Sequence, residues 1–274
     1  MIHDEALVPS AIARVRARKT DGRDFTDNVV VEEPLQIRLR RGDGEDEALA
    51  VTMRTPGADL ELAAGFLLSE GVITAPSQLL GVIVCGDRTL TARQRANTVV
   101  ATVTPESVAP ARLLDRRFTV SSACGVCGSS QLDDLRERGV VNVTPTHHDA
   151  QRLAMLTDEL SPRQKVFAKT GGLHAAALFA PDLSLRRVRE DVGRHNAVDK
   201  VIGAALMAGE LPLAGCTLVC SGRIGYEIVQ KAVVAGISAL VAVSAPTSLA
   251  LDTARAFGLT LVGFARNGTG TSYF

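Results

Sequence analysis

Aromatic residues are scarce in this sequence, which contains no tryptophan, two tyrosines and eight phenylalanines among 274 residues. So few rings exclude a binding surface built from many stacked aromatic side chains. Charge of one sign is also lacking, because lysine and arginine number 30 and aspartate and glutamate number 30. A net charge of zero gives no overall attraction to nucleic acid or to an acidic membrane.

Long hydrophobic runs are absent as well. No apolar run approaches the roughly 20 residues that a membrane-spanning helix needs. The amino-terminal segment has no apolar core long enough for a signal peptide. We therefore expect a cytoplasmic protein with neither nucleic acid nor a membrane as partner.

Cysteine is limited to five residues, an odd number without the spacing of a disulfide framework. Two of them, Cys124 and Cys127, form a Cys-x-x-Cys pair within a stretch rich in serine and glycine. In a reducing compartment, such a pair indicates chemistry or metal binding more than a structural bridge.

The remaining composition, 46% hydrophobic and 22% charged, is typical of a globular protein with one large domain or two smaller ones. Residues 146–274 show short apolar strands alternating with longer helices, which predicts a three-layer α/β part with a covered sheet. The strands are expected at 173–179, 185–188, 217–220, 239–244 and 259–264, and the helices at 149–160, 196–208, 226–235 and 248–257.

The first half has a different pattern. Residues 1–27 are polar and are expected to form a flexible tail, and residues 28–145 an additional α+β part whose strands could extend the same sheet. Its strands are expected at 29–31, 35–39, 48–53, 80–84 and 98–103, and its helix from Asp59 to the stop at Gly71. The Cys-x-x-Cys loop spans 119–130, and Ser129 or Ser130 is expected to cap a short helix at 131–138.

The Cys-x-x-Cys pair permits several chemistries. A helix beginning after it would favour a thiolate, which could accept sulfur as a persulfide, exchange disulfides or bind zinc. A closed zinc site needs four ligands, and the second pair would be Cys216 and Cys220, of which Cys220 lies in an apolar strand. Two inert cysteines in a turn remain a further alternative.

A second cluster runs from residue 189 to 200, at a turn between a strand and a helix. Helix amino termini at such turns bind anions, and Arg194, His195 and Lys200 would add positive charge. Asp191 could hold a ribose or a base edge, or orient His195. A capped helix with local ion pairs explains the same residues equally well.

Three other segments flank strands of the α/β half, so their tips could meet at one sheet edge and bind a large polyanionic molecule. Each has a structural alternative, such as a turn that enters a strand. The candidate binding residues are Thr170, Gly171, Gly172 and His174 in the first segment, Ser221 and Arg223 in the second, and Phe264, Ala265, Arg266, Asn267, Gly268 and Thr269 in a polar, flexible turn after the last strand.

In their joint order along the chain, these segments resemble the FdhD family of formate dehydrogenase accessory sulfurtransferases. Each matching stretch is short, and the order of all of them is specific. They are residues 53–57, 60–66, the Cys124/Cys127 loop, 170–174, 189–200, 221–223, 245–248 and 263–266.

The resemblance implies a cytidine-deaminase-like core, although the deaminase zinc signature is absent, so no permanent metal is expected. It also implies a homodimer that receives persulfide sulfur from a cysteine desulfurase on Cys124, with Cys127 as its partner. The sulfur would pass to the molybdenum cofactor, in its bis-molybdopterin guanine dinucleotide (bis-MGD) form, before insertion into apo-formate dehydrogenase. Guanine nucleotide ends would bind the α/β part. The main alternative is a zinc- or redox-active cofactor-binding chaperone that carries no sulfur.

Overall fold

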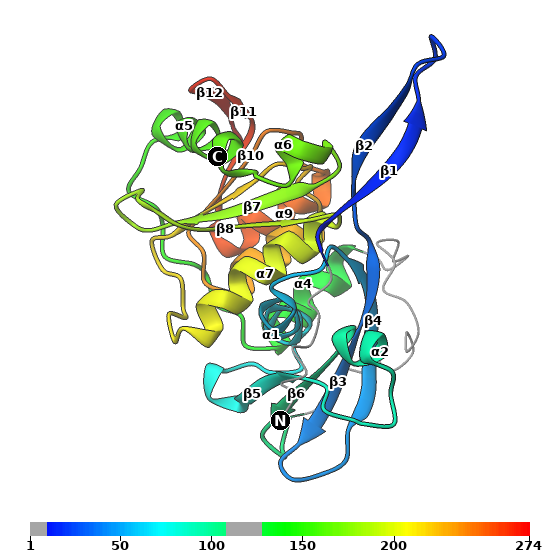
Figure 1. Ribbon diagram of the computed structural model, residues 1–274. Coiled ribbons are helices and arrows are strands. Elements are labelled where there is room, and N and C mark those ends of the chain that lie inside the picture. Colours follow the sequence, from blue (N-terminus) through cyan, green and yellow to red (C-terminus); the bar gives the residue numbers. More distant parts are fainter. Residues whose placement is uncertain (1–9, 108–127) are drawn as a thin grey trace.

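The computed structural model describes residues 10–107 and 128–274, with only the backbone for residues 128–130. Two sheets lie on opposite sides of a group of helices, and a two-stranded ribbon projects from the body of the molecule (Figure 1). The ribbon consists of β1 (Ile12–Arg18) and β2 (Asp24–Val30), paired antiparallel. The flexible tail predicted for residues 1–27 is therefore wrong from Ile12 onward.

The smaller sheet has the strand order β4-β3-β6-β5. Its strands are β3 (Glu33–Arg41), β4 (Glu47–Arg54), β5 (Leu79–Val84) and β6 (Thr98–Val103). The strands predicted at 35–39, 48–53, 80–84 and 98–103 are confirmed, and β3 and β4 pair antiparallel as a hairpin. The sheet is separate from the larger one, which corrects the expectation that the first half adds strands to the same sheet.

Between these strands lie α1 (Asp59–Glu70), the short 3-10 helix η1 (Pro76–Gln78) and α2 (Ala92–Ala96). α1 ends at Gly71, whose φ of 76° lies in the left-handed region that glycine occupies without steric cost. The predicted end of this helix is thus confirmed.

The larger sheet has the order β12-β11-β10-β9-β7-β8. β9, β10 and β11 are parallel, whereas β7, β8 and β12 run antiparallel to their neighbours. The strands are β7 (His174–Phe179), β8 (Leu185–Asp191), β9 (Thr217–Cys220), β10 (Ala239–Ala242), β11 (Thr260–Arg266) and β12 (Thr269–Ser272).

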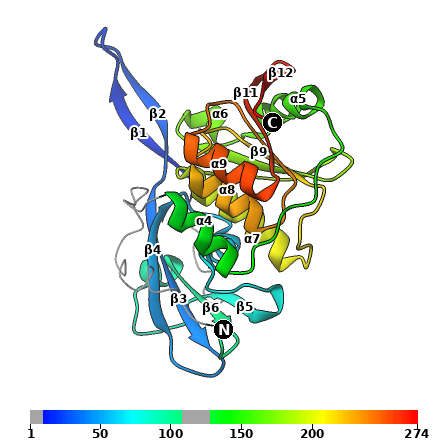
Figure 2. The same cartoon turned by 180° about the vertical axis from the view of Figure 1, so that it is seen from behind.

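Helices cover both faces of this sheet, as the three-layer prediction requires (Figures 1 and 2). One face carries α5 (Ala150–Leu160), η2 (Ser161–Arg163) and α6 (Phe167–Thr170). The other carries α7 (Arg194–Met207), α8 (Tyr226–Val234) and α9 (Ser248–Phe257), with α4 (Gly128–Glu137) beside α9. Strand alternation divides the core, since Ala175 and Ala177 pack toward α5 while Ala176 and Leu178 pack toward α7.

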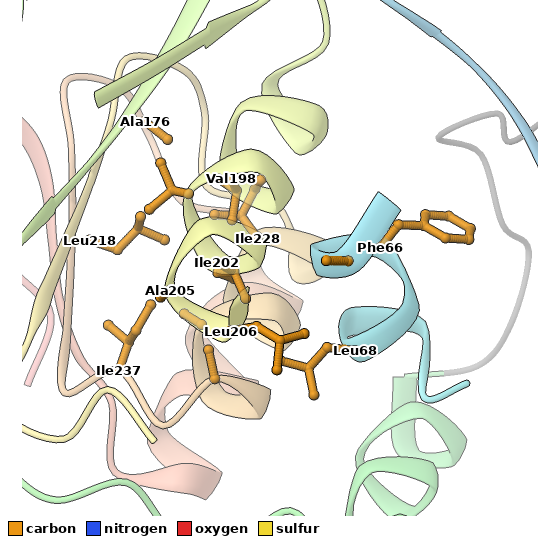
Figure 3. Close-up of a cluster of buried hydrophobic side chains, with 14 of the residues drawn as sticks. Phe66, Leu68, Ala176, Val198, Ile202, Ala205, Leu206, Leu218, Ile228 and Ile237 are labelled. Atoms are coloured by element: carbon orange, nitrogen blue, oxygen red, sulfur yellow. The ribbon is translucent and has the colours of Figure 1, made fainter. Parts of the chain in front are cut away.

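The two halves of the molecule meet where α1 crosses α7 (Figure 3). Gly65 and Gly203 lie at the crossing, and a Cβ atom at either position would overlap backbone of the opposite helix. Glycine therefore permits this close approach. Beside it, Lys231 pairs with the buried carboxylate of Asp199 at 2.8 Å, and Ser69 of α1 donates a hydrogen bond to Asp199 at 2.8 Å. Burial raises the pKa of Asp199.

Candidate functional site

A cavity of about 630 Å³ opens at one end of the larger sheet. Four strand termini reach it: the ends of β9, β10 and β11 and the start of the antiparallel β7. Loops far apart in sequence therefore converge there. The lining residues are Thr157, Asp158, Leu160, Ser161, Gln164, Phe167, Gly171, Gly172, Leu173, His174, Val192, Ser221, Val243, Ala265, Arg266 and Asn267. Three predicted segments thus share one cavity, with Gly171, His174, Ser221 and Arg266 among its walls.

The first wall is the turn after α6. Gly171 has a φ of 67°, which requires glycine, and Gly172 lies against Val30 at the base of the ribbon. Thr170 does not line the cavity, because its hydroxyl donates to the carbonyl of Val166 at 2.9 Å. Glu190 accepts the first backbone N–H groups of α6, including that of Val166 at 3.0 Å. Thr170 and Glu190 therefore hold the glycine turn in place.

The second wall is formed by His174 and Ser221. The Ser221 hydroxyl accepts the backbone N–H of Ala175 at 2.8 Å, and its own N–H donates to the Ala175 carbonyl at 3.0 Å. This double contact fixes Ser221 at the mouth of the sheet. Burial lowers the pKa of His174, and the positive charge of Arg194 lowers it further, so the imidazole is neutral near pH 7.

Asp191 does not line the cavity, which corrects its predicted role as a ribose or base contact. Its side chain is 0% exposed, and its oxygens accept hydrogen bonds from backbone N–H groups of Thr55 and Gly193 and from the amide of Asn196. It also pairs with Lys200 at 2.6 Å. Lys200 is itself buried, so the positive charge expected there is neutralised. The pair fixes the loop between β8 and α7 instead of contacting a ligand.

α7 begins with Arg194 and His195. These residues lie beside the cavity, on the sheet face that α7 and α8 cover. Arg194 Nε is buried without a hydrogen-bond partner among the described residues, and Gly222 lies close to both Arg194 and His174. His195 Nε2 is 3.4 Å from Glu227 Oε2, and this contact lowers the pKa of Glu227. Glu227 was not expected from its sequence context. Its place in the first turn of α8, just after the predicted Ser221 segment, was the available signal.

Arg223 follows Ser221 but is exposed and does not line the cavity. The predicted role of Arg223 as an anion contact beside Ser221 stays a prediction. Phe264, Gly268 and Thr269 also lie outside the lining.

The third wall is the end of β11, where the predicted flexible turn is instead a β-hairpin with β12. Asn267 and Gly268 both have positive φ, 51° and 68°, as a two-residue Asn-Gly hairpin turn requires. Phe264 lies where the pairing of β11 with β12 shifts register, between Gly263 and Arg266; its φ is 53° and its side chain is 54% exposed. A non-glycine residue in this region is uncommon and often lies near a functional site.

The Cys-x-x-Cys pair, Cys124 and Cys127, lies outside the described residues. The helix that follows it, α4, begins at Gly128, so Ser129 and Ser130 lie in its first turn and are not its N-cap, contrary to the prediction. Tyr226 at the start of α8 donates a hydrogen bond to the Gln131 carbonyl at 3.3 Å. The first turn of α4 is therefore joined to the start of α8, which follows the Ser221 segment.

The other three cysteines are buried and form no disulfide. Burial raises the pKa of Cys216, and that of Cys220 to about 12. Both thiols are thus poor nucleophiles and poor metal ligands. Within residues 10–107 and 128–274, no three His, Cys, Asp or Glu side chains are grouped to hold a metal ion. In the same ranges, no helix has the length and apolar character to span a membrane.

Fold and site together define a mixed α/β protein whose loops build a cavity of mixed polar and apolar lining at one end of the larger sheet. Comparison with known proteins specifies it further. The model of the FdhD/NarQ family matches residues 30–274, so the chain belongs to this family.

The chain is 47% identical to sulfur carrier protein FdhD of Streptomyces avermitilis over 250 residues, which cover 90% of this chain and 87% of that protein. It is 45% identical to sulfur carrier protein FdhD of Anaeromyxobacter sp. over 273 residues, covering 95% and 91%. The crystal structure of a protein from Desulfotalea psychrophila, described as a formate dehydrogenase accessory protein, matches with a TM-score of 0.71 over 95% of both chains at 21% identity. This last likeness supports the fold.

Proposed function

We propose that this protein is a sulfur carrier that accepts persulfide sulfur on Cys124 and delivers it to a molybdenum cofactor for formate dehydrogenase. Membership of the FdhD/NarQ family carries this proposal, together with relatives named sulfur carrier proteins. The Cys-x-x-Cys pair supplies the chemistry, and the cavity at the end of the larger sheet supplies a place for the cargo.

In the first step, the Cys124 thiolate attacks the outer sulfur of a cysteine desulfurase persulfide. The sulfur–sulfur bond of the donor breaks, its cysteine leaves as a thiolate, and Cys124 carries the persulfide. α4 begins directly after Cys127, and the first backbone N–H groups and the dipole of a helix favour negative charge at its amino terminus.

In the second step, the persulfide sulfur leaves for the cofactor. If Cys127 attacks Cys124, a disulfide forms, hydrosulfide is released, and a thiol reductant later restores both cysteines. Such exchange suits the cytoplasm, where thiols are kept reduced.

The cargo, bis-MGD, is proposed to place one guanine nucleotide end in the cavity of about 630 Å³, a size common for ligand sites. The Arg266 guanidinium can pair with a phosphate. Gly171 and Gly172 carry no side chain, so a flat or phosphorylated group of the ligand can approach their backbone closely. His174, neutral and half-buried, can form a hydrogen bond with the bound nucleotide. Arg194 adds positive charge next to His174.

The expected partners are a cysteine desulfurase, which gives the sulfur, and apo-formate dehydrogenase, which receives the cofactor. We also propose a homodimer, and a cytidine-deaminase-like core formed by the larger sheet and its helices. No permanent metal is assigned to the protein.

The test of sulfur acceptance is mass spectrometry after incubation with a cysteine desulfurase and cysteine. Wild type should gain the mass of one sulfur on Cys124, Cys124→Ala should gain none, and Cys220→Ala, which removes a buried thiol, should react like wild type. Labelling that persists in Cys124→Ala would overturn the assignment. An unlabelled wild type that purifies with zinc would support the chaperone that carries no sulfur.

The test of the cargo site is calorimetry with a guanine nucleotide. Arg266→Ala removes a charge from the cavity and should weaken binding about tenfold or more. Arg88→Ala, an exposed arginine outside the cavity, is the matched control. Equal affinity of wild type and Arg266→Ala would reject this placement.

A further inference from the structure

The ribbon of β1 and β2 projects beyond the rest of the molecule in both views (Figures 1 and 2). β2 lies against α6, whereas the outer edge of β1 pairs with no strand in the described part of the chain. A two-stranded hairpin alone is at best marginally stable in water. The FdhD/NarQ family model begins at residue 30, so nearly all of the ribbon lies outside the region that defines the family. The ribbon is therefore a candidate for contact with a particular partner.

One face of β1 is basic and the other is apolar, because the two kinds of side chain alternate along the strand. The basic face carries Arg14, Arg16 and Arg18. The apolar face carries Ala13, Val15 and Ala17, with Phe25 of β2 opposite Ala17. Val15 and Phe25 are each 37% exposed, so this face is open to solvent.

Two of the three arginines have no carboxylate partner. Arg18 lies directly opposite Asp24 on β2, and the two side chains form an ion pair at 2.6 Å. Arg14 and Arg16 lie opposite uncharged residues of β2, and neither forms an ion pair with a residue that the structure describes. Both side chains are exposed. Negative charge is therefore missing beside these two positions.

The backbone hydrogen bonds show which groups point to the open edge of β1. The N–H of Val31 donates to the Ala11 carbonyl at 2.9 Å, and the N–H of Lys19 donates to the Arg23 carbonyl at 2.8 Å. Because antiparallel pairs alternate, the odd-numbered residues of β1 bond to β2. The even-numbered residues point their N–H and C=O groups outward.

Ile12 agrees with this pattern. Its N–H donates to the Ser10 hydroxyl at 3.2 Å, and that hydroxyl donates to the Ile12 carbonyl at 2.9 Å, which closes the edge at the base of the ribbon. The outward groups of Arg14 and Arg16 have no such partner among the described residues. These two residues thus combine available backbone groups with an unpaired positive charge.

We propose that β1 binds an extended acidic segment of a partner protein, which adds to the ribbon as a third strand. The outward backbone groups would bond to the segment, and carboxylates at alternate positions of it would lie beside Arg14 and Arg16. Apolar residues between the carboxylates would lie beside Val15. A second copy of β1 fits this edge poorly, because arginines would meet arginines, and edge charges also protect against uncharged strands.

Fluorescence anisotropy with a labelled peptide of alternating glutamate and valine tests the binding to the full chain. Low ionic strength is used, because salt screens exposed charges. Wild type should bind the peptide. The double variant Arg14→Glu/Arg16→Glu should bind it about tenfold more weakly or worse, since like charges would lie side by side. Circular dichroism should show that this variant keeps the wild-type fold.

The matched control is Arg88→Glu/Arg152→Glu, which alters the net charge equally at two exposed arginines outside the ribbon. It should bind the peptide like wild type. Cys124→Ala should do the same, so the result is independent of sulfur acceptance. A peptide of the same composition with its glutamates in one block should bind more weakly, because its carboxylates no longer alternate.

Absence of binding by wild type, or equal binding by the Arg14/Arg16 variant, would overturn the proposal. Loss of binding in the control variant would show a general effect of charge and would also overturn it. Equal binding of the block peptide would refute addition as a strand. A single-stranded RNA or a phosphatidylserine vesicle could bind wild type more tightly than the peptide and depend on Arg14 and Arg16. The basic face would then serve nucleic acid or a membrane, and the assignment to an acidic protein segment would be wrong.

Discussion

The buried pair of Asp191 and Lys200 allows a quantitative test of how the loop at the cavity is held. Asp191→Asn preserves the shape of the side chain but removes its charge. The Lys200 ammonium, 2% exposed, would then keep only backbone carbonyls, those of Thr55 at 2.9 Å and Glu190 at 3.3 Å. Leaving one charge of a buried pair without its partner costs about 3–5 kcal/mol.

The reverse change, Lys200→Met, should cost less. The Asp191 carboxylate would still accept hydrogen bonds from Thr55, Gly193 and Asn196, which partly stabilise its charge. We expect a loss of about 2 kcal/mol for Lys200→Met. In the double variant no charge is buried, so its loss should fall short of the sum of the single losses by about 2 kcal/mol.

Urea denaturation of the four proteins measures these free energies of unfolding. For a slope of about 2 kcal/mol per molar, Asp191→Asn should lower the unfolding midpoint by about 2 M. A loss below about 1 kcal/mol, or single losses that simply add, would refute the reasoning. So would an Asp191→Asn variant of normal stability that no longer bound guanine nucleotide, because Asp191 would then be a direct contact.

Three further predictions concern particular atoms. Gly203→Ala should destabilise the protein by about 1–3 kcal/mol in the same urea assay. A Cβ atom there would overlap the Glu61 carbonyl and lie 2.6 Å from the Gly65 nitrogen. Unchanged stability would contradict the close helix crossing. Cys220, with a pKa of about 12, should resist iodoacetamide at pH 8 in the native protein and react in urea, and rapid native labelling would contradict its burial. His174 has a lowered pKa, so the stability that it contributes is present above pH 6.5 and lost as pH falls through the folded-state pKa. His174→Gln should therefore flatten this part of the stability–pH curve. An unaltered curve would count against the lowered pKa.

Much of the fold could be predicted because its signals are local. Gly71 ends α1 as expected, and Asp149 caps α5 by accepting the N–H of Arg152 at 2.8 Å. The hairpin to β12 was missed although Asn267-Gly268 is a strong hairpin signal. The ribbon formed by β1 and β2 was also missed, since its many charged residues resemble those of a tail.

The candidate site could be predicted only in part. The segments around Gly171, Ser221 and Arg266 were selected because polar loops at strand ends commonly form ligand sites, and all three line the cavity. Asp191 had the same local signal but is buried. Whether an ionisable side chain near a strand end faces solvent depends on what packs over it, here Thr55 from the other half of the chain.

The sequence by itself determined the strand and helix pattern, the family resemblance and the Cys-x-x-Cys pair, because these depend on the order of neighbouring residues. Tertiary structure decided that the smaller sheet is separate and that three distant loops form one cavity. The order β11-β10-β9-β7 brings the walls of the cavity together across the sheet. Such pairing joins residues far apart in the chain, and local periodicity carries no information about it.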